Sequence, residues 1–342
     1  GRLLSHSTTV GGQAHKTSYQ YDAAGRLAAR KVQAGTTQDL ITQRYGYDTA
    51  ERLAQIKYIK GEGTGSEQLI EQIDYGYDAK GQRTSKTTLN NNGAGVNETP
   101  MTASYDAANR MTGVTLNISG TSKTYALTYD LNGNLTGKTN AQNAAEATTY
   151  TWDANDRLTG ITQPGLMANF SYDVFGRRIQ STITRQGQSP ATVQYLYEGS
   201  QALGEIRDGR LSHRLLTGLT LDETIARIAV NAAGQKDAAM SRVYMTDALN
   251  SVIAQLNDDT GAAIANSYGY SPYGESQTIG PDATSNPNQY TSRENDGTGL
   301  YFYRARYYDP ILKRFISSDP IGLRGGLNTY MYVRGNPVTH ID

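Results

Sequence analysis

The sequence predicts an all-β protein made of antiparallel β-hairpins that repeat along the chain, and three observations lead to this prediction. An aromatic residue followed by Asp, two spacers, a turn-forming residue and usually Arg occurs seven times in the first half. The aspartates of these copies lie 20 to 30 residues apart, a period typical of repeat architectures. The composition, with 36 glycines and 25 tyrosines against 4 phenylalanines, indicates many turns and strands wetted on one face.

Each copy is expected to form one hairpin. The aspartate suits the first position of a type I turn, because its carboxylate can accept hydrogen bonds from backbone N–H groups further into the turn. Three residues later the chain needs a positive φ, which Gly, Asn and Asp tolerate and which Glu51 tolerates poorly. The seven copies begin at Tyr21, Tyr47, Tyr77, Tyr105, Tyr129, Trp152 and Tyr172.

In the strand before each turn, aromatic or branched side chains lie two residues apart, as in Phe170 and Tyr172. A period of two puts such side chains on one face of a strand, so stacked hairpins are expected to carry a ladder of tyrosines. The residues from Gly1 to Leu3 look like the end of another repeat. We therefore expect the chain to start inside a longer array, with any signal peptide or upstream domain outside it.

The regular spacing ends near Glu198, and the residues from there to 285 are expected to form further hairpins. The segment from Leu221 to Val230 fits either a short helix or a strand, because its apolar residues match both periods. A turn is predicted over Asp259 to Gly261, between two strands.

Composition excludes several classes of function. Thirty-two basic residues balance thirty-two acidic ones without blocks, so nucleic-acid binding is not predicted. No apolar run is long enough for a membrane span. The absence of cysteine excludes disulfides and thiolate metal sites, and four isolated histidines favour packing or surface roles over metal binding. No metal or cofactor is predicted. The histidines are His6, His15, His213 and His340.

Residues 286–342 have a denser pattern than the rest. They contain Tyr303-Arg304-Ala305-Arg306-Tyr307-Tyr308-Asp309-Pro310, then Arg314-Phe315, and then Asp319-Pro320-Ile321-Gly322-Leu323. With these motifs and the Tyr-Asp repeats, essentially the whole chain closely resembles the Rhs, or YD-repeat, family. By this resemblance residues 1–198 are the repeat array, 199–285 a pre-core segment of further hairpins, and 286–342 the Rhs-repeat-associated core.

The resemblance implies a spiralling antiparallel β-sheet that closes as a hollow shell, or β-cocoon, plugged by a core with little helix. Tyrosine-rich faces and a polar composition are compatible with such a cavity. The family includes toxins delivered between bacteria, the C component of insecticidal Tc toxins, wall-associated toxins and the animal teneurins. Its shells enclose a variable C-terminal toxin, so this toxin domain is the expected partner, with secretion-machinery, immunity or chaperone proteins as further candidates. A secreted or delivered effector, or a bacterial cell-surface protein, is the expected location.

The resemblance also implies an aspartic self-cleaving protease in the core, which contains an Arg, an Asp 13 residues later and a second Asp 23 residues after that. Arg306, Asp319 and Asp342 have this spacing. One carboxyl of such a pair keeps its proton as an acid while the other activates water, and Arg306 is expected to orient or neutralise them. The alternative is structural, since Asp before Pro is common in turns.

Two functions therefore stay open. The first is a scaffold that encloses a C-terminal toxin and releases it by autoproteolysis. The second is an adhesion or recognition shell on a cell surface, with the core as a structural plug. The family's Pro-x-Gly-Leu segment and the bond that is cut are expected beyond Asp342, so the chain by itself is expected to be inactive.

Overall fold

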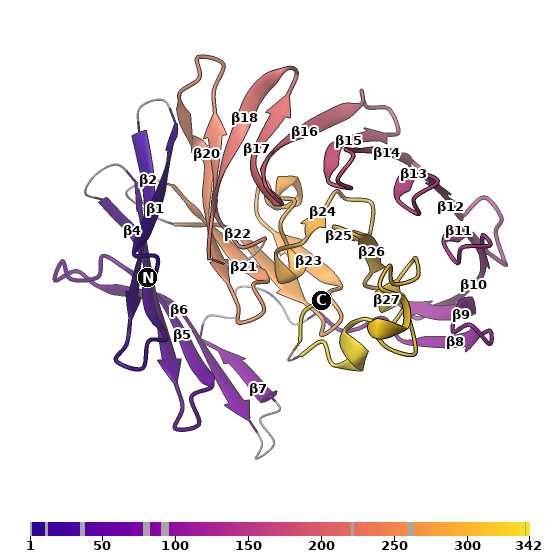
Figure 1. The fold of residues 1–342 in the computed structure, drawn as a ribbon, viewed down its shortest axis with the longest axis horizontal. Coiled ribbons are helices and arrows are strands. Elements are labelled where there is room, and N and C mark those ends of the chain that lie inside the picture. Colours follow the sequence, from indigo (N-terminus) through magenta and orange to yellow (C-terminus); the bar gives the residue numbers. More distant parts are fainter. Residues whose placement is uncertain are drawn as a thin grey trace. The chain divides into compact units, whose positions relative to one another are not determined.

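The protein is all-β, and its strands follow one another as antiparallel hairpins (Figure 1). The structure, a computed structural model, describes residues 2–10, 13–34, 38–77, 83–89, 96–219, 222–258, 263–338 and 340–342. The chain divides into two compact units. Unit 1 comprises Gly1–Ala94, Leu196–Gly269 and Gln277–Ser292, and unit 2 comprises Gly95–Tyr195, Tyr270–Ser276 and Arg293–Asp342. The predicted fold class is confirmed, while the hollow interior concerns both units together and stays a prediction.

Unit 1 contains two sets of strands that pair in chain order. The first set is β1 (Ser5–Val10), β2 (Gln13–Tyr21), β3 (Leu27–Ala34), β4 (Gln38–Tyr47), β5 (Leu53–Lys60), β6 (Gln68–Tyr77) and β7 (Arg83–Thr88). The second set is β17 (Gln201–Arg207), β18 (Arg210–Thr217), β19 (Thr224–Val230), β20 (Lys236–Thr246), β21 (Val252–Asn257) and β22 (Ile264–Tyr270), followed by the short 3-10 helices η1 (Ala283–Ser285) and η2 (Tyr290–Ser292). Apolar side chains of β3 to β6 pack against those of β18 to β21, for example Ile56, Ile73, Ile225 and Val243.

Unit 2 contains a larger set of paired strands and the C-terminal core. The strands are β8 (Met101–Tyr105), β9 (Met111–Ile118), β10 (Thr121–Tyr129), β11 (Leu135–Asn140), β12 (Ala147–Trp152), β13 (Leu158–Gln163), β14 (Leu166–Tyr172) and β15 (Arg178–Arg185). The core holds β24 (Glu294–Asn295), β25 (Tyr301–Tyr303), β26 (Arg306–Asp309), β27 (Arg314–Phe315), η3 (Gly322–Arg324) and η4 (Val333–Gly335). The chain passes from one unit to the other within β16 (Ala191–Glu198), at the last residue of β22, and within β23 (Ser276–Ile279).

The aromatic face of the repeats in unit 2 is covered by the core. Phe170 and Tyr150 are 4% and 5% exposed, and they belong to one apolar cluster with Leu300, Phe302 and Tyr307. The predicted tyrosine ladder therefore exists, and in this unit it packs against core side chains. Such burial is the main source of stability for a sheet with one polar face.

The repeat motif forms the predicted turn. In the first copy the backbone N–H of Gly25 donates to the carbonyl oxygen of Asp22, and the carboxylate of Asp22 accepts from the backbone N–H and the side chain of Arg26. Gly25 has φ +82°, and Glu51, the poor fit, also adopts a positive φ of 63°. Five arginines pair in this way with the aspartate four residues earlier, at 2.6 to 2.7 Å: Arg26, Arg52, Arg110, Arg157 and Arg177.

Neighbouring repeats are joined by the aromatic residue of the motif. The hydroxyl of Tyr47 donates to the carbonyl oxygen of Leu27, at 2.9 Å, and the guanidinium of Arg26 lies 4.4 Å from the centre of the Tyr47 ring. The aromatic tip thus binds the residue after the previous repeat's last position. Arg2, Arg52, Arg110 and Arg157 lie over the next aromatic ring in the same way as Arg26. Equivalent aromatic tips bind Leu3, Leu53, Met111, Leu135 and Leu158. A hydrogen bond and a cation–π contact per junction each contribute about 1 kcal/mol.

Three further turns have the same backbone geometry without the motif. Asn231, Asp247 and Ser271 each occupy the first position, and in each turn the N–H three residues later donates to their carbonyl oxygen. Asn231 also accepts the N–H groups of Ala233 and Gln235 through its side chain. Hairpins predicted after Glu198 are thus present, and three of their turns are of this kind.

The open choice over Leu221 to Val230 is resolved as a strand, since β19 runs over Thr224–Val230. The turn predicted over Asp259 to Gly261 lies outside the described residues, as do Gly1, Leu221 and the third repeat's turn from Asp78 to Gln82. Arg2 and Leu3 make the contacts of a repeat's end, because Arg2 lies over the Tyr21 ring and Leu3 accepts the Tyr21 hydroxyl.

Candidate active site in the C-terminal core

Four buried aromatic side chains form the floor of the candidate site. Tyr303, Tyr308, Phe315 and Tyr332 are at most 5% exposed, and their ring centres lie 4.3 to 5.9 Å apart. They come from β25, β26, β27 and the residue before η4, so the folded core is needed to bring them together. Edge-to-face packing of this kind stabilises a fixed ring arrangement.

Arg306 lies on this floor. Its guanidinium carbon is 3.7 Å from the centre of the Phe315 ring, and its side chain is 7% exposed. One guanidinium nitrogen, Nη1, donates to the carbonyl oxygen of Thr329 at 3.2 Å. A planar guanidinium that is stacked on a ring and hydrogen-bonded at one edge has little rotational freedom, so its orientation is fixed.

The two predicted aspartates both bind Arg306. Oδ2 of Asp319 is 3.1 Å from Nη1, and Oδ2 of Asp342 is 3.1 Å from Nη2. The side chain of Asp319 is 14% exposed and that of Asp342 is 35% exposed. The structure therefore brings together all three residues that the spacing suggested, and the two carboxylates meet through the guanidinium between them.

Asp319 also has the structural role that an Asp before Pro commonly has in a turn. Its Oδ1 accepts the backbone N–H of Ile321 at 3.0 Å, and its own N–H donates to the same Thr329 carbonyl that binds Arg306. One carboxylate oxygen thus forms the turn while the other faces Arg306. A Cβ atom added at Gly325 would lie 2.5 Å from Oδ2, so a larger residue here would push the carboxylate away from its present position.

A buried arginine connects the core to the repeat strands of unit 2. Arg178, the first residue of β15, is 0% exposed and forms ion pairs with Glu294 and Asp296 of the core. Its guanidinium also lies 4.3 Å from the centre of the Phe302 ring. The burial opposes the charged form, but the two carboxylates and neighbouring hydroxyls hold its pKa well above the ordinary value. Sequence reasoning missed Arg178, because it directly follows the repeat residue Arg177 and has no motif of its own.

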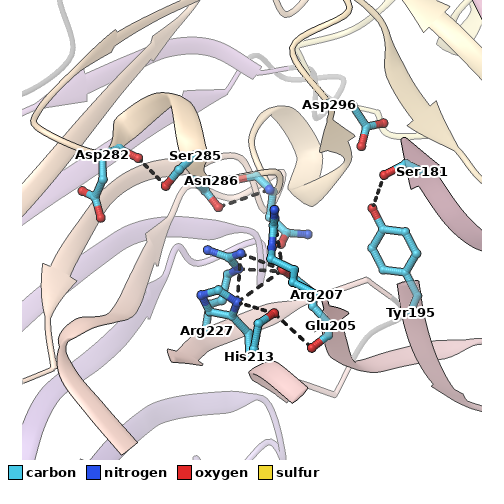
Figure 2. A network of polar contacts seen from close by, with 12 residues as sticks. Ser181, Tyr195, Glu205, Arg207, His213, Arg227, Asp282, Ser285, Asn286 and Asp296 are labelled. Atoms are coloured by element: carbon cyan, nitrogen blue, oxygen red, sulfur yellow. Dashed lines mark hydrogen bonds and ion pairs between the residues drawn. The ribbon is translucent and has the colours of Figure 1, made fainter. Parts of the chain in front are cut away.

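A second buried ionic group lies in unit 1, and Figure 2 shows its side chains pointing toward one another. Glu205 accepts two hydrogen bonds from Arg227, at 2.8 and 2.6 Å, and lies 3.4 Å from Nδ1 of His213. Burial opposes the charge on Glu205, yet Arg227 and His213 hold its pKa below its usual range. Burial lowers the pKa of His213. The group joins β17, β18 and β19, so we interpret it as structural.

Two other histidines have partners within unit 1. His15 is fully buried and binds the carboxylate of Asp258 at 2.7 Å, and His6 stacks on Tyr19 with ring centres 5.8 Å apart. Within the described ranges, no group of three His, Cys, Asp or Glu side chains is arranged to hold a metal ion. Of the helices in those ranges, none has the length and apolar character that crossing a membrane requires.

Comparison with known proteins agrees with this architecture. A family model described as RHS Repeat matches residues 1–38, 105–145 and 129–166. The tRNA nuclease WapA of Bacillus subtilis (strain 168) is 30% identical over 280 residues, covering 79% of this chain and 11% of that protein. Double-stranded DNA deaminase toxin A of Burkholderia cenocepacia (strain H111) is 28% identical over 239 residues, covering 63% of this chain and 16% of that protein.

The fold is also found in a crystal structure of TcdB2-TccC3 without its hypervariable C-terminal region. The match has a TM-score of 0.62 at 20% identity and covers 99% of this chain and 21% of that one. The chain thus spans between 11% and 21% of the length of these three proteins. The repeat model, the relatives and the common fold show that the chain belongs to the RHS, or YD-repeat, family.

Proposed function

We propose that this chain is the encapsulating scaffold of a polymorphic toxin, which encloses a C-terminal toxin domain and releases it by aspartic autoproteolysis in the core. The observation that carries the proposal is Arg306, whose guanidinium binds Asp319 and Asp342 at once. The names of the relatives support it, since they describe a nuclease, a deaminase toxin and a protein with a hypervariable C-terminal region.

The proposed reaction is the hydrolysis of one peptide bond that follows the core. One aspartate takes a proton from water as the oxygen attacks the carbonyl carbon, and the other gives a proton to the leaving nitrogen. The C–N bond breaks, and the products are a carboxyl group and a free amine. Arg306 stabilises negative charge in the site and holds the two carboxylates in place.

Partners and location follow from the same proposal. The enclosed toxin domain is the main partner, and secretion-machinery, immunity or chaperone proteins are further partners of a toxin that is delivered to another cell. The scaffold is accordingly a secreted or delivered effector of bacterial competition, or a protein of the bacterial cell surface. The scattered charges and the net charge of zero give no support to binding nucleic acid.

The test uses a chain extended beyond Asp342 by Pro-x-Gly-Leu and a reporter domain. The extended chain is expected to cut itself during expression, and Asp319→Asn and Asp342→Asn are expected to stay intact on a denaturing gel. Asp309→Asn is the matched control, because Asp309 also precedes a proline and caps its turn through Oδ1, which asparagine retains. Cleavage of either test variant at the wild-type rate would show that the pair is not catalytic.

The second candidate is a surface recognition shell in which the core is only a plug. The observation in its favour is the turn that Asp319 forms through Oδ1 and its carbonyl oxygen. If the extended wild-type chain stays intact while its fold is unchanged by circular dichroism, this second function replaces the first.

A further inference from the structure

We propose that Arg293 is a positioning residue for the proposed cleavage, because it holds the main chain at residue 342 and so directs the segment that follows. This inference rests on the proposed function. Nη2 of Arg293 donates to the main-chain oxygen of Asp342 at 2.9 Å. Arg306 binds the side chain of the same residue, with Nη2 at 3.3 and 3.1 Å from its two carboxylate oxygens. Two arginines therefore hold residue 342, one by its side chain and one by its backbone.

The aromatic floor sets the distance between the two guanidinium groups. Arg293 lies 4.6 Å from the centre of the Tyr303 ring, and Arg306 lies 3.7 Å from the centre of the Phe315 ring. These two rings are in edge contact, with centres 5.6 Å apart and planes at 87°. Because both rings are buried, they cannot shift independently, and the guanidinium groups that stack on them keep a fixed separation.

The main-chain oxygen of residue 342 determines where the following peptide goes. At the end of this chain the oxygen belongs to a carboxylate, and in a chain that continues it is the carbonyl oxygen of the next peptide bond. Fixing that oxygen and the Asp342 side chain together restricts the rotation of the backbone at this residue. The bond to be cut lies a few residues further on, so this restriction brings it to the carboxylates in one register.

The backbone that carries Arg293 is itself anchored. Glu294, the next residue, and Asp296 form the buried ion pairs with Arg178 of β15. The position of Arg293 is thus set by the repeat strands of unit 2 as well as by the core. A charged side chain with this anchoring differs from a solvated surface arginine, whose ion pairs are weak and mobile.

The experiment measures the rate and the position of self-cleavage in the extended chain. Arg293→Ala is expected to slow cleavage at least about tenfold, and mass spectrometry of the products is expected to show several termini in place of one. Addition of ethylguanidinium is expected to restore part of the rate, since it can occupy the vacated stack on Tyr303. Arg324→Ala, an exposed arginine of the same core, is the control and is expected to behave as wild type.

The outcomes separate this inference from the proposed function. If Arg293→Ala cuts at the wild-type rate and at one position while Asp319→Asn stays intact, the role of Arg293 is wrong and the function stands. If Asp319→Asn is also cut, the proposed function itself fails. If fluorescence of Trp152 shows that Arg293→Ala does not fold, Arg293→Lys replaces it. That variant is expected to fold and to cut about three- to tenfold more slowly, because lysine lacks the flat stacking surface, and a wild-type rate would overturn the inference.

Discussion

In the repeats each arginine lies four residues after the aspartate that it binds, whereas in the core Arg306 lies 13 and 36 residues before its two aspartates. The repeat pairs are partly exposed, with arginine side chains 27% to 33% accessible, and the Arg306 side chain is 7% accessible. A repeat pair forms within one hairpin. The core pair needs β25 to β27 and the last residue to be in place.

The arginine–aspartate ion pair therefore has two different roles in this molecule. A local pair fixes a turn and survives the loss of distant parts of the chain. A pair gathered from distant residues reports whether the whole core is folded, so chemistry built on it starts only after folding. This order suits the proposed function, in which cutting before the scaffold is folded would release the toxin domain too early.

The largest expected effect concerns the geometry around Asp319. Gly325→Ala places a methyl carbon 2.5 Å from Oδ2 of Asp319, so the carboxylate must shift, although the backbone at Gly325, with φ −75°, accepts alanine. Cleavage of the extended chain is expected to fall about 100-fold, as when a preorganised group is lost from a site. Leu323→Ala, an exposed change in the same loop, is expected to have no effect. Equal rates for the two variants would contradict the role given to Asp319.

The next effect is on the stability of unit 2. Arg178→Ala leaves Glu294 and Asp296 without their buried partner and is expected to lower the free energy of unfolding by about 3 to 5 kcal/mol. Urea unfolding followed by fluorescence of the single tryptophan, Trp152, measures this, because Trp152 lies in unit 2. Its sequence neighbour provides the control, and Arg177→Ala is expected to cost under about 1 kcal/mol. Similar losses for both variants would mean that the core ion pairs contribute no more than a repeat pair.

A smaller effect is expected at a junction between repeats. Arg157→Ala removes the pair with Asp153, a bond to the carbonyl oxygen of Asp173 and the contact with the Tyr172 ring. The expected loss is about 1 kcal/mol in the same urea experiment. Arg177 stacks on Phe175 of its own turn, so its removal is expected to cost less. A larger loss for Arg177→Ala than for Arg157→Ala would contradict the inter-repeat role.

The smallest effect is a pH dependence within single turns. The backbone N–H of Arg52 is the main cause that lowers the pKa of Asp48, and the Arg52 side chain adds to it. Because the folded pKa is lower than the unfolded value of about 3.9, the stabilisation is complete above that pH and is lost as the pH falls through the folded pKa. After correction for intrinsic rates, hydrogen exchange at Ala50 and Arg52 is expected to accelerate below about pH 4.

An internal control for this pH effect exists in the same unit. Asn231 replaces aspartate in an equivalent turn and does not titrate, so the amides of Ala233 and Gln235 are expected to show no such acceleration. Acceleration in both turns alike would assign the change to general acid unfolding.

Much of the repeat structure was predictable, because a turn depends on nearby residues. Asp22 and Gly25 indicate their own turn, and the alternation of Phe170 and Tyr172 indicates which face they share. The junctions were not predictable, since the contact of Arg26 with Tyr47 depends on how two hairpins lie side by side. The turn at Asn231 was missed because one polar side chain and one glycine are too common to stand out.

The site was predictable only through the family resemblance, which supplied the spacing of Arg306, Asp319 and Asp342. No local pattern marks Arg293, because its contact with residue 342 spans 49 residues. No local pattern marks Gly325 either, since the space at this position is limited by a carboxylate six residues earlier rather than by its own backbone. Long-range packing determines these positions.

Tyr105 follows a copy of the repeat motif that lacks the usual arginine. Gln82 stands where the previous repeat would have arginine, and Arg314 of the core lies over the Tyr105 ring instead, at 5.2 Å, while donating to the carbonyl oxygen of Asn109. The core thus supplies the cation that the sequence of the array lacks at this point.

The hydrogen bonds from the aromatic tips to the preceding repeats give the array a direction. The aromatic tips of six copies reach back to a carbonyl oxygen that was synthesised earlier, so these contacts do not depend on a later hairpin. A ribosome that delivers such a chain from the amino end therefore presents each new hairpin to a finished docking place, so the array can grow in step with translation and the C-terminal core arrives last.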